Sequence, residues 1–177
     1  MSAVLQAERP GGMLHRIASR PGPLLVAVTV MSWGAVGIAL VTQHVFDMQP
    51  CPWCVLMRLI FIAIGAVTLL GALAPAVAAR RGAATFGLAL VASGLAAAFW
   101  HYFVASNSPS CNLTLAERIV GWTTLDQLLP AVFEPRASCA DANISLLGIP
   151  YPLCAAIVYA ASAIVLVRAF AVASAAR

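Results

Sequence analysis

The sequence contains no lysine and few charged residues of any kind, since aspartate, glutamate and arginine make up 9% of its 177 residues. A soluble domain carries roughly 25% charged residues, so this chain has too little charge to cover a surface that faces water. Hydrophobic residues make up 62% of the sequence, which indicates an integral membrane protein. All ten basic residues are arginines, scattered between apolar segments rather than gathered in a stripe, and we therefore expect no nucleic-acid partner.

Four apolar segments, at about 23–41, 55–73, 83–105 and 151–167, are long enough to cross a membrane. Each approaches the roughly 20 residues that a helix needs to cross a hydrocarbon core about 30 Å thick. Lipid cannot satisfy an open backbone, so helices are the expected form. We predict an all-α integral membrane fold, a four-transmembrane-helix bundle that forms a single membrane domain over residues 1–177.

The arginines also predict how the chain lies in the membrane. Seven of them lie in the N-terminal tail, the loop between the second and third spans, or the C-terminal end: Arg9, Arg16, Arg20, Arg80, Arg81, Arg168 and Arg177. By the positive-inside rule these parts are cytoplasmic. The outer side then receives a short loop at about 42–50 and a long loop at about 106–150.

The long outer loop contains a predicted helix. Apolar residues recur there at spacings of three and four, as on one helical face: Leu115, Ile119, Trp122, Leu125 and Leu129. We expect Pro130 to end this helix. The apolar face fits either a helix that lies on the membrane surface or a packed cap on the bundle.

Four of the five cysteines lie on the outer side in this topology, where disulfides form and persist. Cys51 and Cys54 form a CxxC pair at the mouth of the second span, and Cys111 and Cys139 lie in the long loop. An even set of four suits a disulfide system, although the loop pair taken alone also fits a structural staple. Cys154 lies just inside the fourth span, where we interpret it as a small apolar packing residue.

The segment around Cys51 and Cys54 predicts reactive thiols. Pro52 suits the first position of a helix, which places Cys51 near the N-cap. The helix macrodipole favours an anion there and lowers a thiol pKa. Arg58 follows Cys54 by four residues and shares its helical face. A charge within a span usually has a function, here to stabilise a thiolate or bind a second reactant; the alternative is an arginine that reaches the headgroups.

Taken together, these features resemble the DsbB family of bacterial inner-membrane thiol:quinone oxidoreductases. The resemblance extends over about residues 23–168 and includes the four spans and the cysteine pair between the third and fourth. The stretch Cys51-Pro-Trp-Cys54-Val-Leu-Met-Arg58 fits the family's CxxCxxxR pattern, although the family often has Gln or Glu where Met57 stands. Segments 129–133 and 147–150, on either side of Cys139, are also similar to the family's loop.

The resemblance implies an electron relay. A DsbA-like, thioredoxin-fold partner would attack Cys111, and Cys139 would pass electrons to Cys51. Cys54 would then meet ubiquinone or menaquinone, with Arg58 and His101 as the residues that bind it. The chain would lie in the inner membrane, in contact with lipid, with both termini cytoplasmic and the cysteine loops periplasmic.

Three alternatives remain open from the sequence. The first is a quinone-linked thiol reductase similar to the vitamin K epoxide reductases. The second is a non-enzymatic four-span protein whose outer loops carry structural disulfides. The third is a membrane protein that binds a metal through thiolates; we expect no metal site, because there is no second CxxC and His44 is the only further ligand near the first.

Overall fold

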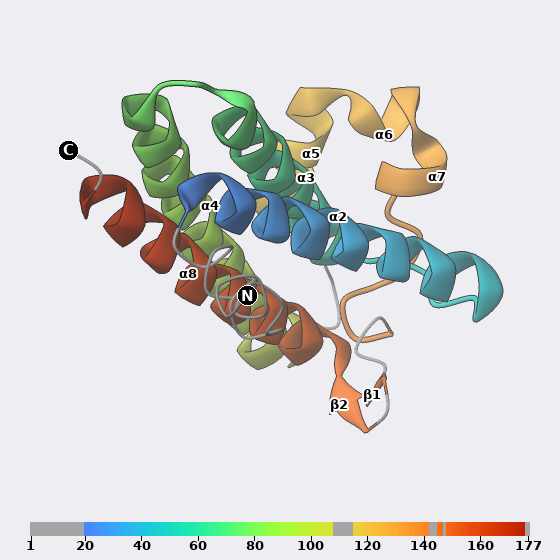
Figure 1. Ribbon diagram of the computed structural model, residues 1–177. Coiled ribbons are helices and arrows are strands. Elements are labelled where there is room, and N and C mark those ends of the chain that lie inside the picture. The colour runs from blue at the N-terminus through green and yellow to red at the C-terminus, as the bar shows by residue number, and fades with distance from the viewer. Residues whose placement is uncertain (1–19, 108–114, 142–144, 147, 176–177) are drawn as a thin grey trace, which may run out of the picture.

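Four long helices form the body of the protein in a computed structural model, which describes residues 20–107, 115–141, 145–146 and 148–175 (Figure 1). They are α2 (Pro21–Val45), α3 (Pro52–Leu73), α4 (Val77–Phe103) and α8 (Tyr151–Ala175). Each is long and apolar enough to cross a membrane, and the third candidate span runs on through the 3₁₀ helix η1 (Ala105–Asn107). The predicted all-α fold with four spans is confirmed.

Most of the helices extend beyond the apolar segments that predicted them. The prediction placed residue 42 in a loop, but α2 continues to Val45 and includes Thr42 and Gln43. The side chains of Thr42 and Gln43 are buried, and the Thr42 hydroxyl donates to the Ala39 carbonyl at 3.0 Å. A prediction from hydropathy ends the span at such polar residues. The helix itself continues, because other groups of the protein form hydrogen bonds with their side chains.

The helices pack in a ring in which α2 and α4 each contact both α3 and α8. Small residues on α4 permit close approach of the neighbouring helices. Gly87, Gly94, Ala97 and Ala98 are buried, whereas the nearby Ser93 is exposed. This arrangement brings the C-terminal end of α2 together with the N-terminal ends of α3 and α8.

Tyr159 fixes α8 against the first turns of α3. Its ring lies over Gly94 so closely that a Cβ there would come within 2.3 Å of the tyrosine Cζ. The same ring stacks on Phe61 with 4.0 Å between centroids, and its hydroxyl donates to the Met57 carbonyl at 2.9 Å. These contacts set the spacing of α3 and α8 next to Cys54 and Arg58.

The loop between α4 and α8 carries three short helices rather than the single helix predicted up to Pro130. They are α5 (Leu115–Thr123), α6 (Leu125–Leu128) and α7 (Pro130–Phe133). Thr124 has a left-handed φ of 52° and separates α5 from α6, and Pro130 begins a helix instead of ending one. A short antiparallel pair, β1 (Ser145–Leu146) and β2 (Ile149–Pro150), precedes α8.

The apolar face predicted in this loop is largely exposed. Helix α5 packs on α3 and buries Ala116 and Val120, whereas Leu115 is 64% and Trp122 85% exposed. Exposed apolar side chains of this size match a helix at a membrane surface better than a packed cap.

Candidate active site

The start of α3 brings the two CxxC sulfurs together. Cys51 is the N-cap and Pro52 the first helical residue, as predicted, and the Cys54 amide donates to the Cys51 sulfur at 3.4 Å. The two sulfurs are 3.0 Å apart, and both cysteines are free thiols. A disulfide requires about 2.05 Å between sulfurs, so the two sulfurs need to approach by only about 1 Å to bond.

The two thiols differ in their surroundings. Cys51 is fully buried, whereas Cys54 lines a pocket. The hydrogen bond with the Cys54 side chain and burial raise the pKa of the Cys51 thiol far above its ordinary value. The shared proton therefore stays on Cys51, and any negative charge of the pair resides on Cys54, where the helix N-terminus favours it.

His101, on α4, lies against Cys51. The imidazole is buried, its Nε2 is 3.5 Å from the Cys51 sulfur, and the ring interacts with the backbone of Cys139. The ligand atoms of Cys51, Cys54 and His101 lie within 4.8 Å of one another. A structural zinc site takes four ligands, and the described residues bring no fourth His, Cys, Asp or Glu into this group.

Arg58 is buried, with 5% exposure, and lies between α2 and α7. Its Nη1 donates to Gln43 Oε1 at 2.6 Å and to the Val132 carbonyl at 3.0 Å, and its Nη2 donates to the Ala39 carbonyl at 3.4 Å. Within the described part of the chain no carboxylate pairs with Arg58. Its guanidinium interacts electrostatically with Cys54. The side chain is thus fixed inside the protein and does not extend to a headgroup region.

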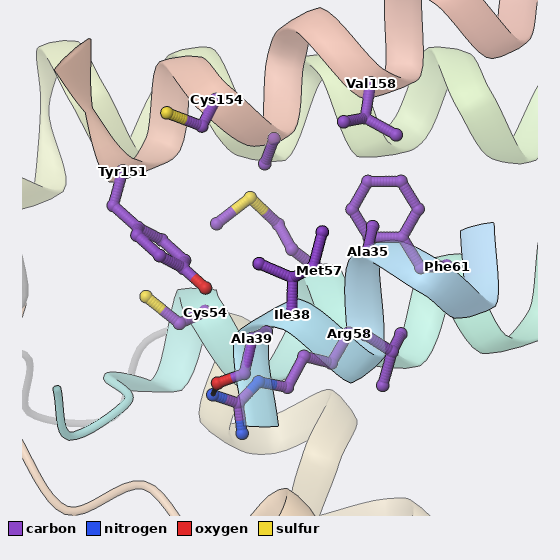
Figure 2. Close-up of a pocket in the computed structure, with 12 residues that line it drawn as sticks. Ala35, Ile38, Ala39, Cys54, Met57, Arg58, Phe61, Tyr151, Cys154 and Val158 are labelled. Atoms are coloured by element: carbon purple, nitrogen blue, oxygen red, sulfur yellow. Dashed lines mark hydrogen bonds between the residues drawn. The ribbon is translucent and has the colours of Figure 1, made fainter. Parts of the chain in front are cut away.

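Cys54 and Arg58 border one apolar pocket between α2, α3 and α8, with a volume of about 190 Å³ (Figure 2). Its polar groups gather at one end, where Tyr151 reaches from α8 toward Cys54. The Tyr151 hydroxyl is 3.2 Å from that of Thr42. Apolar walls with a few convergent polar groups are typical of a small-molecule site. This donor set fits a quinone, an apolar ring with polar oxygens.

The remaining predicted site residues lie close to the CxxC pair or outside the described residues. Cys139 is buried and disulfide-bonded. The preceding segment is attached beside Cys51, because the amides of Arg136 and Ala137 donate to the Pro50 carbonyl at 2.9 and 3.2 Å. Cys111 lies outside the described residues.

Two residues with polar contacts at the site were missed in the sequence. Gln43 holds Arg58, and Tyr151 lines the pocket. A glutamine at the end of an apolar run is a signal for Gln43, since polar side chains inside a span usually have a function. His101 was expected at the quinone, but it contacts Cys51 and does not line the pocket.

Comparisons with known proteins agree on one family. The family described as "Disulfide bond formation protein DsbB" matches residues 21–169. The disulfide bond formation protein B of Herminiimonas arsenicoxydans is 34% identical over 131 residues, which cover 73% of this chain and 82% of that protein. The protein of the same name from Ralstonia nicotianae is 37% identical over 136 residues, which cover 76% and 83% respectively.

Proposed function

The chain belongs to the DsbB family of thiol:quinone oxidoreductases, which reoxidise DsbA with quinone as electron acceptor, and we propose that its own reacting groups are Cys51, Cys54, Cys111 and Cys139. The observation that carries this assignment is the pocket that Cys54 and Arg58 share. It brings a reducible pair, a fixed positive charge and an apolar space together at the end of a candidate span.

In this proposal Cys54 and Arg58 hold the quinone, which is ubiquinone or menaquinone. A bound quinone supplies an acceptor for two electrons and two protons, so the oxidation of two thiols to one disulfide is balanced. Cys54 presents the thiolate, and Cys51 retains its proton until the disulfide forms. Arg58 stabilises negative charge at Cys54, and Tyr151 directs its hydroxyl toward the same end of the pocket.

The loop pair serves the soluble partner, a DsbA-like thioredoxin-fold dithiol. A thiolate of the partner attacks Cys111, which forms a mixed disulfide and frees Cys139, and Cys139 attacks Cys51 and releases the Cys54 thiolate. The second thiol of the partner then displaces Cys111, so the partner leaves with a disulfide. The Cys111 thiolate attacks Cys139, which re-forms the loop disulfide and releases Cys51 as the second thiol of the membrane pair. Supporting this order, the segment just before Cys139 is bound beside Cys51, since the amides of Arg136 and Ala137 donate to the Pro50 carbonyl.

This relay requires a definite orientation. We place both termini in the cytoplasm and the cysteine loops in the periplasm, with one membrane domain in the inner membrane. The distribution of arginines supports this orientation. Attachment of a membrane-impermeant maleimide to single cysteines introduced at Ser138 and at Arg81 in intact spheroplasts tests it, and we expect labelling only at position 138.

Turnover by the purified protein tests the function. The protein is mixed with a reduced thioredoxin-like partner and ubiquinone or menaquinone, while quinone absorbance and partner thiols are followed together. We expect one partner disulfide for each quinone reduced. Partner oxidation without quinone consumption, or zinc or copper bound in proportion to protein by elemental analysis, contradicts the proposal.

A further inference from the structure

We propose that Gln43 is a positioning residue for Arg58, an uncharged anchor that fixes the guanidinium and leaves its positive charge available to Cys54. This inference rests on the proposed function, because it assigns Arg58 to the thiolate and the quinone. It concerns a residue that lies in the last turn of α2, next to none of the cysteines in sequence.

The contacts of Gln43 define its orientation. The side chain is buried, with 3% exposure. Its Oε1 accepts from Arg58 at 2.6 Å, and its Nε2 donates to the Ala131 carbonyl of α7 at 3.2 Å. The reversed amide would place NH₂ against the guanidinium, where both groups are donors. The amide is thus held at both ends and joins α2, α3 and α7 at one point.

The chemistry of the acceptors supports an uncharged anchor. A buried arginine is ordinarily paired with a carboxylate, since an isolated buried charge is costly. Arg58 is held by an amide oxygen and by the carbonyls of Ala39 and Val132, all of which are neutral. These groups accept three hydrogen bonds from its N–H donors without cancelling its charge. The remaining partner for that charge in the described residues is the thiol end of the pocket, where Arg58 interacts electrostatically with Cys54 and Tyr151.

The contrast between glutamine and glutamate provides the test. Gln43→Glu keeps the acceptor for Arg58 and nearly the same shape, but it introduces the carboxylate that the structure avoids. We expect the pH at half-maximal alkylation of Cys54 by iodoacetamide, measured by mass mapping of the reduced protein, to rise by about one unit, which corresponds to about tenfold less thiolate at a given pH. Quinone turnover falls in parallel. A purely structural role predicts no shift in this profile as long as the variant stays folded.

Gln43→Met provides a second variant of similar volume that removes both hydrogen bonds and adds no charge. We expect a smaller shift in the alkylation profile and a higher KM for quinone, because the guanidinium keeps its charge and loses its fixed position. Gln127→Glu, the same chemical change on the exposed helix α6, is the matched control and leaves both readouts unchanged. Thermal unfolding in detergent identifies variants that retain the fold.

The outcomes separate this inference from the proposed function. Unchanged alkylation profiles in folded Gln43→Glu and Gln43→Met overturn the positioning role, even when the parental protein reduces quinone. If Gln43→Glu does not accumulate as folded protein, Gln43→Met decides alone, and unchanged profile and KM overturn the proposal. A shifted profile in a chain whose parental form reduces no quinone supports the positioning role while the function fails, because alkylation requires no quinone.

Discussion

The Nε2 atom of His101 lies 3.5 Å from the sulfur of Cys51, so the buried member of the CxxC pair touches an imidazole nitrogen, which can donate or accept a proton. The same ring interacts with the backbone of Cys139. His101 therefore stands between the membrane cysteine pair and the loop cysteine, where sulfur-to-sulfur transfer needs a proton acceptor.

Replacing His101 by phenylalanine tests this position. The substitution keeps most of the ring volume and removes the proton acceptor, and we expect electron transfer from the loop pair to Cys51 to slow by about a hundredfold. Single turnovers stopped by alkylation, followed by mapping of the oxidised cysteines, measure this step. His44→Phe, at an exposed histidine on α2, is the control and retains the parental rate. Equal rates in both variants contradict the assignment.

The pH dependence of Cys51 alkylation tests why its proton is retained. Only the thiolate of a cysteine reacts with the alkylating reagent. The pKa of Cys51 is raised, mainly by the hydrogen bond with Cys54 and further by burial. We therefore expect its alkylation to be slow at neutral pH and to increase only in strongly alkaline solution. Cys54→Ala removes the first cause, and we expect the midpoint of the Cys51 profile to move to lower pH. An unchanged midpoint means that burial alone governs Cys51.

Replacing each of two cysteines of the same pocket distinguishes a specific role in the relay from a general effect of losing a thiol. Cys54 and Cys154 both line it, on α3 and α8. We expect Cys54→Ser to abolish quinone reduction by a dithiol while the protein stays folded, because no disulfide can form at Cys51. We expect Cys154→Ser to retain turnover within about twofold, because it exchanges one small side chain for another at the pocket wall and removes no cysteine of the relay. Quinone absorbance measures both, and loss of activity in Cys154→Ser counts against the assigned roles.

The geometry of Arg58 predicts that lysine does not replace it. Lysine keeps the charge but lacks the planar fork that donates to Gln43 and Val132 together. We expect kcat/KM for quinone to fall about tenfold to a hundredfold in Arg58→Lys, since hydrogen bonds to charged groups contribute about 1.5–3 kcal/mol each. Arg136→Lys, at an exposed ion pair with Glu134, provides the control. Equal kinetics in the two variants mean that charge alone suffices.

Packing between α4 and α8 is testable at one glycine. A methyl group at Gly94 meets the Tyr159 ring at 2.3 Å, so the ring must leave its place over Phe61. We expect Gly94→Ala to reduce the free energy of unfolding by about 1–3 kcal/mol, measured by thermal unfolding in detergent. Gly37→Ala, which meets nothing within 4 Å, is the control. A stable Gly94→Ala protein would mean that the helices separate without cost.

Local signals account for what the sequence predicted correctly. The four helices follow from long apolar runs, and the N-cap position of Cys51 follows from Pro52. The spacing of Cys54 and Arg58 places both on one helical face, and the structure puts both at one pocket. Each of these inferences depends on residues within one or two helical turns.

The features that the sequence did not predict depend on packing between residues far apart in the chain. Gln43 contacts Arg58 only because α2 continues past the apolar run and packs on α3. The predicted span ended at residue 41, so this contact could not be inferred from it. His101 and Tyr151 reach the site from other helices, at positions that spacing cannot set. The periodic face from Leu115 to Leu129 predicted one continuous helix, and the left-handed turn at Thr124 divides it without an obvious signal in that pattern.

The attachment of the loop next to the CxxC pair links the docking of the soluble dithiol partner to the binding of quinone. Segment 131–137 is bound through the carbonyls of Ala131 and Val132 and through the amides of Arg136 and Ala137. Any displacement of this segment toward a docked protein must break these bonds, and two of them are made by the Arg58 guanidinium and by Gln43, which holds it. In the proposed relay, we therefore expect the uptake of electrons from the aqueous side and their delivery into the lipid phase to be alternating steps of a single cycle.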